Sequence, residues 1–492
     1  MSYHLEFKME QNLIELLDFS LKYVGKFASY AEARFESTNA SDFVIKNGIL
    51  EASSSSSFHG LGMRFLINGS QGCFSTNNLR KQTVKKLADE SIRTTAAASK
   101  ISEKIDFSDE KTFVKKYSVH QKIKIENFGT DKKISALKEA DDAIKKIASE
   151  RYLSLSDSLT EKFFANTNGS RIFSAIPKIG FYYNFSVLHS SKSAQRSWLY
   201  GSSSGYEILK KWNMPQLLLR EAKALEQNLK FGIKPPKGKV DVVCAPEVVA
   251  IMVHESVGHP YEADRILGRE AAQAGESFVT KEMLNSRIGN ECVNVADDPT
   301  LENSFGYYLF DDEGVKAGKR LLIKNGMINE FLHNRQTAKI FGTKSNAAAR
   351  ALNYSLEPIV RMANTFMVPG EYSEEELVED VKHGIYIKNF MEWNIDDIRL
   401  NQKYVGAEAY LIKNGKVLYS KPVIKPTIEI TTPKLYSSID AVGNKKTLEF
   451  HSGTCGKGEP MQAIPVWFGG PCLRIKSIEV SSKKEQNKKE CK

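Results

Sequence analysis

The chain has 492 residues, of which 41% are hydrophobic and 26% are charged, and its formal net charge is +10. This is the composition of a globular protein, and the length predicts two or three domains. No apolar stretch approaches the roughly 18 residues of a membrane-spanning helix, and the first residues lack the apolar core of a signal peptide. We therefore expect a cytoplasmic protein.

Charge and cysteine usage exclude two further classes. The 69 basic residues are spread along the chain in short clusters, a pattern that does not favour a nucleic-acid partner. The six cysteines include no Cys-x-x-Cys pair, which argues against a structural zinc cluster and against a disulfide framework.

The first half of the chain alternates helix and strand signals. Apolar residues at helical spacing predict helices over residues 11–23, 79–97, 132–148 and 215–229. Runs rich in β-formers predict strands over residues 31–36, 43–53 and 179–187. Asn47-Gly48 and Asn68-Gly69 predict hairpin turns between strands.

Together these signals predict an α+β protein with three domains and a tail. We expect an N-terminal α+β domain over 1–115, a middle α+β domain over 116–233 and a strand-rich C-terminal metal-binding domain over 238–480. A charged tail would follow over 481–492. Lys234-Pro235-Pro236-Lys237-Gly238 is the best linker between the middle and C-terminal domains.

The strongest functional signal is His254-Glu255-Ser256-Val257-Gly258-His259, at the end of an apolar run. Two histidines around a glutamate combine metal ligands with a general base. Residues 240–244 predict a buried strand, and 247–257 predict a helix that carries the motif. The apolar residues on this helix would surround the Glu255 carboxylate with an apolar surface that excludes water.

The five-residue separation of the two histidines constrains the backbone. A straight α-helix places His254 and His259 roughly 140° apart, too far for one ion. Either a π-type turn realigns them, or the helix ends before the second histidine. Gly258 followed by Pro260 favours the second alternative, because glycine adopts the left-handed conformation and proline cannot continue a helix. We therefore expect His259 to return from a loop.

A catalytic zinc ion normally needs a third protein ligand and an open position. The candidates in the sequence are Glu262, Asp264, His333, His451 and Cys455. Cys455 lies between glycines in an expected turn, and Lys457 would help to keep its thiol ionised. The residues alone leave the choice among the five open.

Several separate stretches resemble the TldD/PmbA metalloprotease family, specifically its catalytically competent TldD-type branch. Besides the motif, they are residues 30–36, 47–49, 310–314, 322–326, 358–365 and 454–457. In order and spread they cover nearly the whole chain, from about residue 13 to about residue 476.

The resemblance implies a zinc metallopeptidase, with zinc held by His254, His259 and Cys455 and with Glu255 as the base that takes a proton from a metal-activated water. Peptides or unfolded protein segments would be the substrates, and no substrate-binding residue is assigned. The resemblance also implies an oligomer, with a PmbA/TldE-type subunit or with further copies of the chain. The alternative is a non-catalytic partner or regulatory subunit of such a complex, against which the intact four residues argue.

Overall fold

The computed structural model describes residues 2–270 and 276–482, and the α+β fold class predicted from the sequence is confirmed. The charged tail predicted for 481–492 lies outside the described residues from residue 483 onward. In the described part of the chain, no helix has the length and apolar character that would let it cross a membrane.

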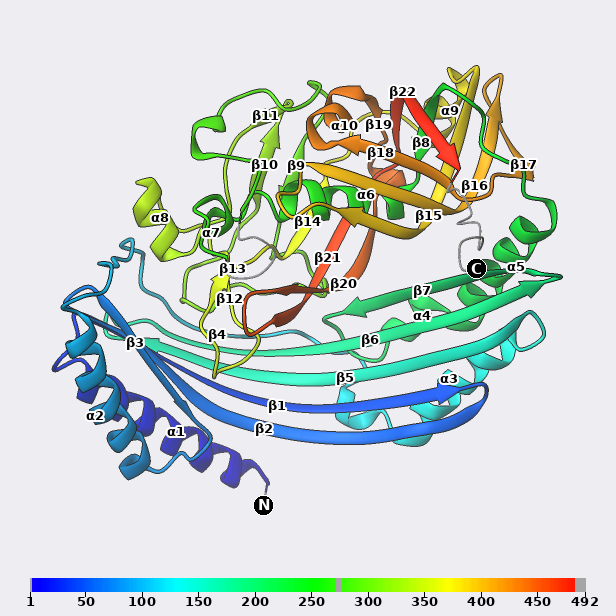
Figure 1. Ribbon diagram of the computed structural model, residues 1–492. Helices are drawn as coiled ribbons and strands as arrows, with labels where there is room; N and C mark the ends of the chain where they lie inside the picture. The colour runs from blue at the N-terminus through cyan, green and yellow to red at the C-terminus, as the bar shows by residue number, and fades with distance from the viewer. Residues whose placement is uncertain (1, 271–275, 483–492) are drawn as a thin grey trace, which may run out of the picture.

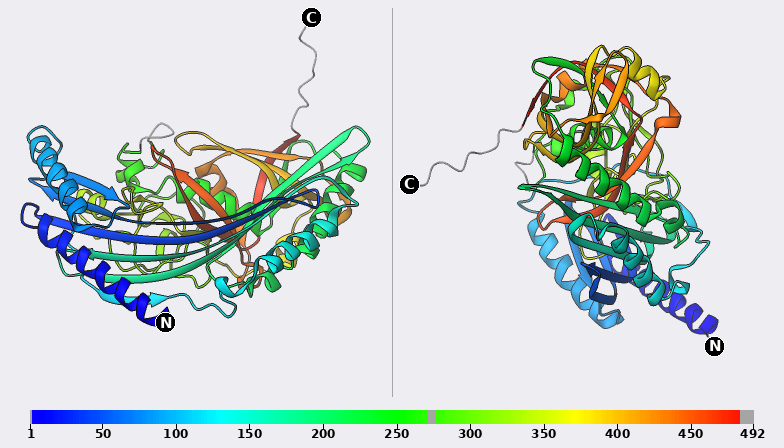
Figure 2. Two further views of the ribbon diagram at one scale, coloured as in Figure 1. Left: turned by 90° about the horizontal axis from the view of Figure 1, so that it is seen from below. Right: turned by 90° about the vertical axis from the view of Figure 1, so that its right-hand side faces the viewer.

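A long curved sheet forms the lower half of the molecule in Figure 1. Its strand order is β3-β2-β1-β5-β6-β4, with β7 also paired to β6, and every neighbouring pair except β4 and β6 is antiparallel. The strands are β1 (Tyr30–Lys46), β2 (Ile49–Ile67), β3 (Ser70–Thr76), β4 (Val114–Ser118), β5 (Ala148–Asn166), β6 (Arg171–His189) and β7 (Lys192–Ser202). Seen from below, the long strands sweep across the molecule (Figure 2).

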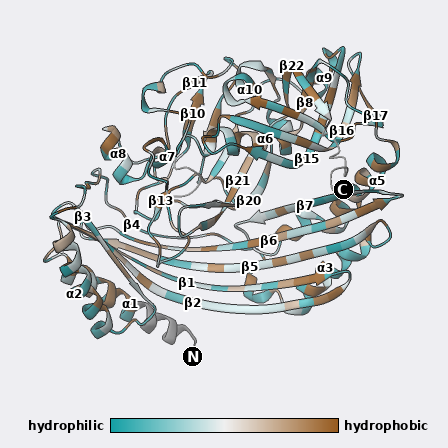
Figure 3. Ribbon diagram, in the orientation of Figure 1, coloured by the Kyte–Doolittle hydropathy of each residue, from teal (hydrophilic) through white to brown (hydrophobic). Residues whose placement is uncertain are grey.

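The sheet joins strands from both sides of residue 115, because β1 pairs with β5 over most of its length. The predicted strands at 31–36 and 43–53 belong to the single strand β1 and the start of β2. Apolar and polar residues alternate along parts of these strands (Figure 3), as expected when one face of a sheet is buried. The domain boundaries at 115 and 233 stay a prediction.

The helices of the first half lie at the two ends of this sheet (Figure 1). They are α1 (Ser2–Val24), α2 (Lys81–Ala98), α3 (Thr130–Ile144), α4 (Ile208–Trp212) and α5 (Met214–Phe231). The four predicted helices are thus confirmed, with larger boundary differences at two of them. Helix α1 begins at Ser2, nine residues before the predicted start at residue 11. Helix α3 ends at Ile144 because Ala148, predicted to be helical, begins β5.

The Asn-Gly pairs form the turns that the sequence predicts. In Asn47-Gly48 and Asn68-Gly69 both residues have positive φ, the conformation that a two-residue type I′ hairpin turn requires. Asn325-Gly326 and Asn414-Gly415 do the same in the C-terminal part.

The C-terminal part sits on the concave side of the long sheet and is rich in strands (Figure 1). A six-stranded sheet has the order β11-β10-β9-β14-β21-β20. It consists of β9 (Val295–Asp297), β10 (Arg320–Lys324), β11 (Met327–Ile328), β14 (Asn364–Met367), β20 (Glu449–Lys457) and β21 (Gln462–Gly470).

A second C-terminal sheet has the order β15-β8-β22-β18-β16-β17, with β19 paired to β22. It consists of β8 (Lys239–Cys244), β15 (His383–Ile395), β16 (Asn401–Lys413), β17 (Lys416–Pro422), β18 (Pro426–Thr431), β19 (Ile439–Val442) and β22 (Leu473–Ser482). The C-terminal part also has the short strands β12 (Ala349–Arg350) and β13 (Ile359–Val360) and the α-helices α6 (Pro246–Val253), α7 (Ala263–Ile266), α8 (Arg335–Phe341), α9 (Glu374–Glu379) and α10 (Thr432–Ser438).

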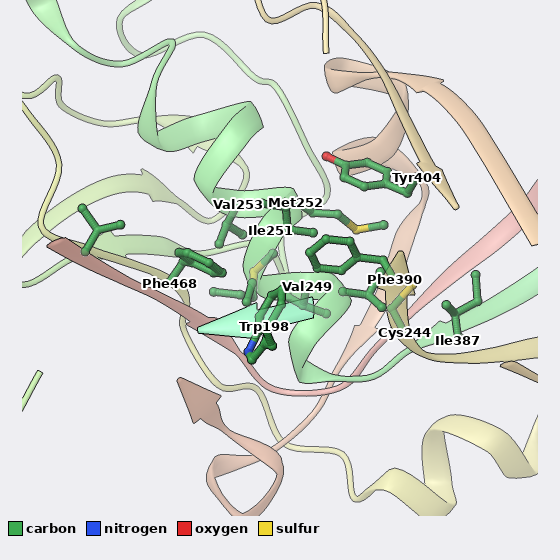
Figure 4. Packing of buried hydrophobic residues seen from close by; sticks show 14 of the residues in the cluster. Trp198, Cys244, Val249, Ile251, Met252, Val253, Ile387, Phe390, Tyr404 and Phe468 are labelled. Carbon is green, nitrogen blue, oxygen red and sulfur yellow. The ribbon is translucent and has the colours of Figure 1, made fainter. Parts of the chain in front are cut away.

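Helix α6 leads into the motif and is buried along its whole length. Its apolar side chains pack against Trp198 from β7, Phe390 from β15 and Phe468 from β21 (Figure 4). A helix that is apolar all round is held by the core on every side. The motif that follows α6 is therefore anchored to the three large sheets.

A buried ion cluster fixes the first turn of α6. Two guanidinium nitrogens of Arg196 on β7 donate to the Glu247 carboxylate at 2.9 and 2.6 Å, and Arg196 Nε donates to Glu221 on α5 at 2.9 Å. All three side chains are buried. Because removal of one partner would leave uncompensated buried charge, this cluster ties α6 to the long sheet.

Candidate metal centre

The motif continues α6 as a single π-helical turn, η2 (His254–Gly258). The His259 amide donates to the His254 carbonyl oxygen, five residues earlier, at 3.3 Å. His259 itself keeps helical backbone angles of φ −67° and ψ −49°. Because a π turn realigns positions five apart, the two imidazole rings lie side by side, with centroids 5.1 Å apart.

The expectation that His259 returns from a loop is therefore wrong, and the π turn is the correct alternative. Gly258 does not take the left-handed conformation. A Cβ at this position would lie 2.5 Å from Met362 Sδ, so the glycine makes room for tertiary packing instead of ending the helix.

Three side chains that the resemblance implies as ligands lie together. The ligand atoms of His254, His259 and Cys455 are within 4.8 Å of one another, and all three residues are buried. Cys455 Sγ lies 3.2 Å from His259 Nε2. Metal–ligand distances of about 2.0 to 2.3 Å place neighbouring ligands of one zinc ion at this kind of separation.

The chemistry of these donors fits a metal ion. Burial by itself would raise the pKa of the Cys455 thiol, but the positive charges of His259 and Arg361 outweigh burial and hold the pKa well below its ordinary value. The thiolate is the form that binds metal. In the described structure His254 Nδ1 is buried and has no hydrogen-bond partner, whereas buried polar atoms normally have one. Two imidazoles and a thiolate suit a tetrahedral ion with one open position.

Cys455 lies within β20, not in the turn expected from its flanking glycines. A Cβ at Gly453 would come within 2.7 Å of the Phe468 ring, and one at Gly456 within 3.0 Å of Met461 Sδ. The two glycines therefore make room for the side chains of Phe468 and Met461, and they do not form a turn.

Glu262 and Asp264, two of the candidate ligands, lie behind the histidine instead of facing Cys455. Glu262 Oε2 is 3.2 Å from His259 Nδ1, the nitrogen away from the thiol. Burial would raise the pKa of Glu262, but Lys457 and His259 outweigh it and hold the pKa well below its ordinary value. Lys457 Nζ also donates to Asp264 at 2.7 Å. This is the geometry in which a carboxylate orients a ligating histidine.

His333 and His451, the other candidates, make different contacts. His333 Nδ1 lies 3.2 Å from Thr337 Oγ1, and the His451 ring lies edge-on to Trp198 at 5.6 Å. Burial lowers the pKa of His333 to about 4 and the pKa of His451 to about 3, with Arg196 adding to the second shift. Both are neutral core residues at neutral pH.

These two histidines predict acid sensitivity. Each is protonated in the unfolded chain below about pH 6.5 but stays neutral in the folded protein until about pH 4 or 3, so stability is lost as the pH falls. Each histidine should therefore make the free energy of unfolding about 2 kcal/mol lower at pH 5 than at pH 7. Urea unfolding at the two pH values tests this, and His451→Phe should flatten the dependence by about half of the combined effect of the pair. An equal slope in the variant would contradict the assignment.

The Glu255 carboxylate accepts hydrogen bonds from two residues that the sequence did not predict as part of the site. Trp393 Nε1 donates to Glu255 Oε1 at 3.1 Å, and Arg399 Nη1 donates to Glu255 Oε2 at 2.8 Å. Trp393 is near the end of β15, and Arg399 lies in the connection from β15 to β16. No local pattern marks them, because both lie about 140 residues beyond the motif.

Three domain models of one family match the chain in order. They are PmbA/TldA metallopeptidase domain 1 over residues 31–95, the central domain over 123–228 and the C-terminal domain over 237–482. The chain belongs to the PmbA/TldA metallopeptidase family. The relationship predicted from the separate sequence stretches is confirmed.

Curated relatives named metalloproteases resemble the chain over more than half of its length. Metalloprotease MJ0996 of Methanocaldococcus jannaschii is 33% identical over 453 residues, which is 90% of this chain and 95% of that protein. A metalloprotease TldD homolog of Buchnera aphidicola is 26% identical over 472 residues, 92% of each chain. A zinc metalloprotease TldD homolog of Saccharolobus solfataricus is 32% identical over 279 residues, 56% of this chain and 58% of that one.

Solved structures share the fold at lower identity. TldE from Thermococcus kodakarensis aligns with a TM-score of 0.72 at 16% identity, over 95% of this chain and all of that one. A proposed modulator of DNA gyrase from Thermotoga maritima aligns with a TM-score of 0.76 at 19% identity, over 95% of this chain and 99% of that one.

Proposed function

We propose that the chain is a TldD-type, zinc-dependent metallopeptidase that hydrolyses peptides or unfolded protein segments. The observation that carries the proposal is the approach of His254, His259 and Cys455 to within 4.8 Å, with Glu255 on the same π turn. Relatives named metalloproteases, one of them a zinc metalloprotease, support it.

His254, His259 and Cys455 would hold the ion, which when bound supplies Lewis acidity toward a peptide carbonyl. Glu255 would accept the proton of the attacking water and return it to the leaving amine. Trp393 donates to one oxygen of its carboxylate and Arg399 to the other, and a carboxylate has about four acceptor sites. Room for a proton therefore remains while the carboxylate stays held.

Glu262 would orient His259 from behind, and Cys455 would contribute negative charge to the centre. Three neutral imidazoles would leave the full charge of the ion, whereas a thiolate removes part of it. The centre should accordingly be a weaker Lewis acid than one with three histidines.

We further propose an oligomer, formed with a PmbA/TldE-type subunit or with further copies of this chain. Membership of the family supports this proposal. Because Cys455 must stay reduced to bind a metal, we place the protein in the cytoplasm. We also propose the domain division at 1–115, 116–233 and 238–480, which membership of the family supports.

Metal removal and reloading test the proposed function. Because three ligands form one centre, we expect elemental analysis to find about one zinc per chain. We also expect the zinc-loaded chain to cleave an unfolded protein such as reduced casein. Chelation should remove zinc and cleavage together, and one equivalent of zinc should restore both.

A matched pair of histidine variants provides the control for metal removal. His254→Gln should lose zinc, whereas His383→Gln, at an exposed position on β15, should keep zinc and cleavage. If cleavage appears only after a PmbA/TldE-type subunit is added, the paired assembly is supported. If the chain contains no zinc and chelators do not change its cleavage rate, the proposal is refuted.

A further inference from the structure

The carboxylate of Glu255 is held by groups from outside its own helix. Arg399 and Trp393, from the region where β15 turns into β16, each donate to a different carboxylate oxygen, at 2.8 and 3.1 Å. The Glu255 and Arg399 side chains are only 9% and 8% exposed. In such a buried pair the two donors fix both the place and the orientation of the carboxylate.

The backbone that carries Arg399 is strained. Arg399 has φ +65°, a conformation that residues other than glycine adopt rarely and at a cost. Its amide donates to the Asp396 carbonyl oxygen at 3.0 Å, and its own carbonyl oxygen accepts from Thr432 Oγ1 at 2.9 Å. Such strain persists only where the surroundings over-determine it, and it concentrates at functional sites.

The loop around Arg399 is built to keep this conformation. The Asp396 carboxylate accepts from the amides of Leu400 at 2.7 Å and Asn401 at 3.1 Å. On the other side, the Phe278 amide donates to the Ile398 carbonyl oxygen at 2.8 Å. The loop therefore has a fixed shape, and its strained residue is the one whose side chain reaches Glu255.

Charge gives the contact a second consequence. The formal charges of a divalent ion, the Cys455 thiolate and the Glu255 carboxylate would sum to zero. Arg399 adds one positive charge directly beside Glu255. The neighbouring cation Lys457 instead faces Glu262 and Asp264 at 3.1 and 2.7 Å. Arg399 therefore directly offsets the charge of the Glu255 carboxylate.

We propose that Arg399 is a positioning residue that acts through Glu255, with Trp393 as the second donor. It would hold the base beside the metal ligands and offset the charge of the carboxylate. This inference rests on the proposed peptidase function and extends the machinery beyond the motif, to the connection between β15 and β16.

The test compares three variants in the zinc-loaded full chain. Arg399→Ala should lower kcat about 100-fold, the usual scale for loss of one preorganised donor, with KM changed less than about threefold. Zinc content and the visible spectrum of the cobalt-substituted protein should stay as in the unaltered chain. Arg399→Lys should recover about tenfold of the lost rate, because lysine keeps the positive charge but lacks the planar guanidinium group of arginine. Trp393→Phe should lower kcat about tenfold through loss of the indole donor.

Two controls separate positioning from a merely structural role. Lys403→Ala removes a cation from the same hairpin that pairs with Glu392 at 3.8 Å, and it should leave kcat unchanged. Added guanidinium ion should raise the rate of Arg399→Ala in a dose-dependent way but should not rescue Glu255→Gln. If Arg399→Ala does not fold, Arg399→Lys and Trp393→Phe carry the test, because both keep a buried group of similar size.

Three results would overturn the inference. They are an Arg399→Ala variant with kcat within threefold of the unaltered chain, a loss confined to KM, which would place Arg399 on the substrate, or a loss that guanidinium and lysine both fail to reverse. An unaltered chain without zinc and without cleavage would instead refute the proposed function, and this inference with it. Zinc-dependent cleavage that survives Arg399→Ala would refute the inference alone.

Discussion

Replacing Glu255 by glutamine should leave zinc bound and remove peptide cleavage. The amide has nearly the shape of the carboxylate but cannot take a proton at neutral pH, so kcat should fall by about 1,000-fold or more. His254, His259 and Cys455 are untouched, so metal content should stay at about one zinc per chain. Elemental analysis and initial rates on the same preparation measure both quantities.

The structure also predicts a stability effect for Glu255→Gln. Glu255 receives two donors, one on each oxygen, whereas glutamine offers one oxygen and one NH2 group. Either Trp393 or Arg399 therefore loses its acceptor, at a cost of about 1 to 3 kcal/mol. Glu449→Gln, at an exposed position on β20, is the matched control and should change neither rate nor stability. Cleavage within tenfold of the unaltered chain would rule out Glu255 as the base.

Replacing Cys455 by serine should weaken zinc binding and cleavage together. A serine hydroxyl stays protonated at neutral pH, so the centre loses its only anionic ligand among the three residues. Loss of groups that merely orient ligands lowers metal affinity about 10- to 100-fold, so loss of a ligand should lower it at least about 100-fold. Competition with a zinc-chelating dye measures the affinity.

Cleavage by Cys455→Ser should return in part at high zinc concentration, because the two histidines remain. Cys73→Ser, at an exposed cysteine of β3, is the matched control and should bind zinc as the unaltered chain does. Unchanged zinc affinity in Cys455→Ser would exclude the thiolate from the centre.

Much of the fold follows from local patterns. The Asn-Gly pairs give the hairpin turns because these residues accept positive φ. Apolar spacing gives the helices within a few residues, except that α1 begins nine residues before its predicted start. The long curved sheet does not follow, because the pairing of β1 with β5 joins segments about 120 residues apart. Strand pairing at such distances depends on the whole fold.

The candidate site divides in the same way. The motif is local, and its five-residue spacing correctly requires either a bulged or an interrupted helix. Gly258 makes room for Met362 instead of ending the helix, and this tertiary contact cannot be read from the sequence around Gly258 and Pro260. On the residues alone Cys455 is one of five candidate third ligands, and only the resemblance to the family favours it over the others.

Arg399 and Trp393 could not be predicted from the sequence. Their role depends on how the end of the β15–β16 hairpin meets the π turn, and a positive φ at Arg399 has no signature in the residue type. Sequence patterns therefore identify the groups that would perform the chemistry, whereas the groups that hold them in place emerge only from tertiary packing.

Diffraction from zinc-loaded crystals on both sides of the zinc absorption edge tests the central claim most directly. We predict one anomalous peak per chain, about 2.0 to 2.3 Å from one nitrogen each of His254 and His259 and from Cys455 Sγ. The absence of a peak there, or a peak at His333 or His451 instead, would contradict the account.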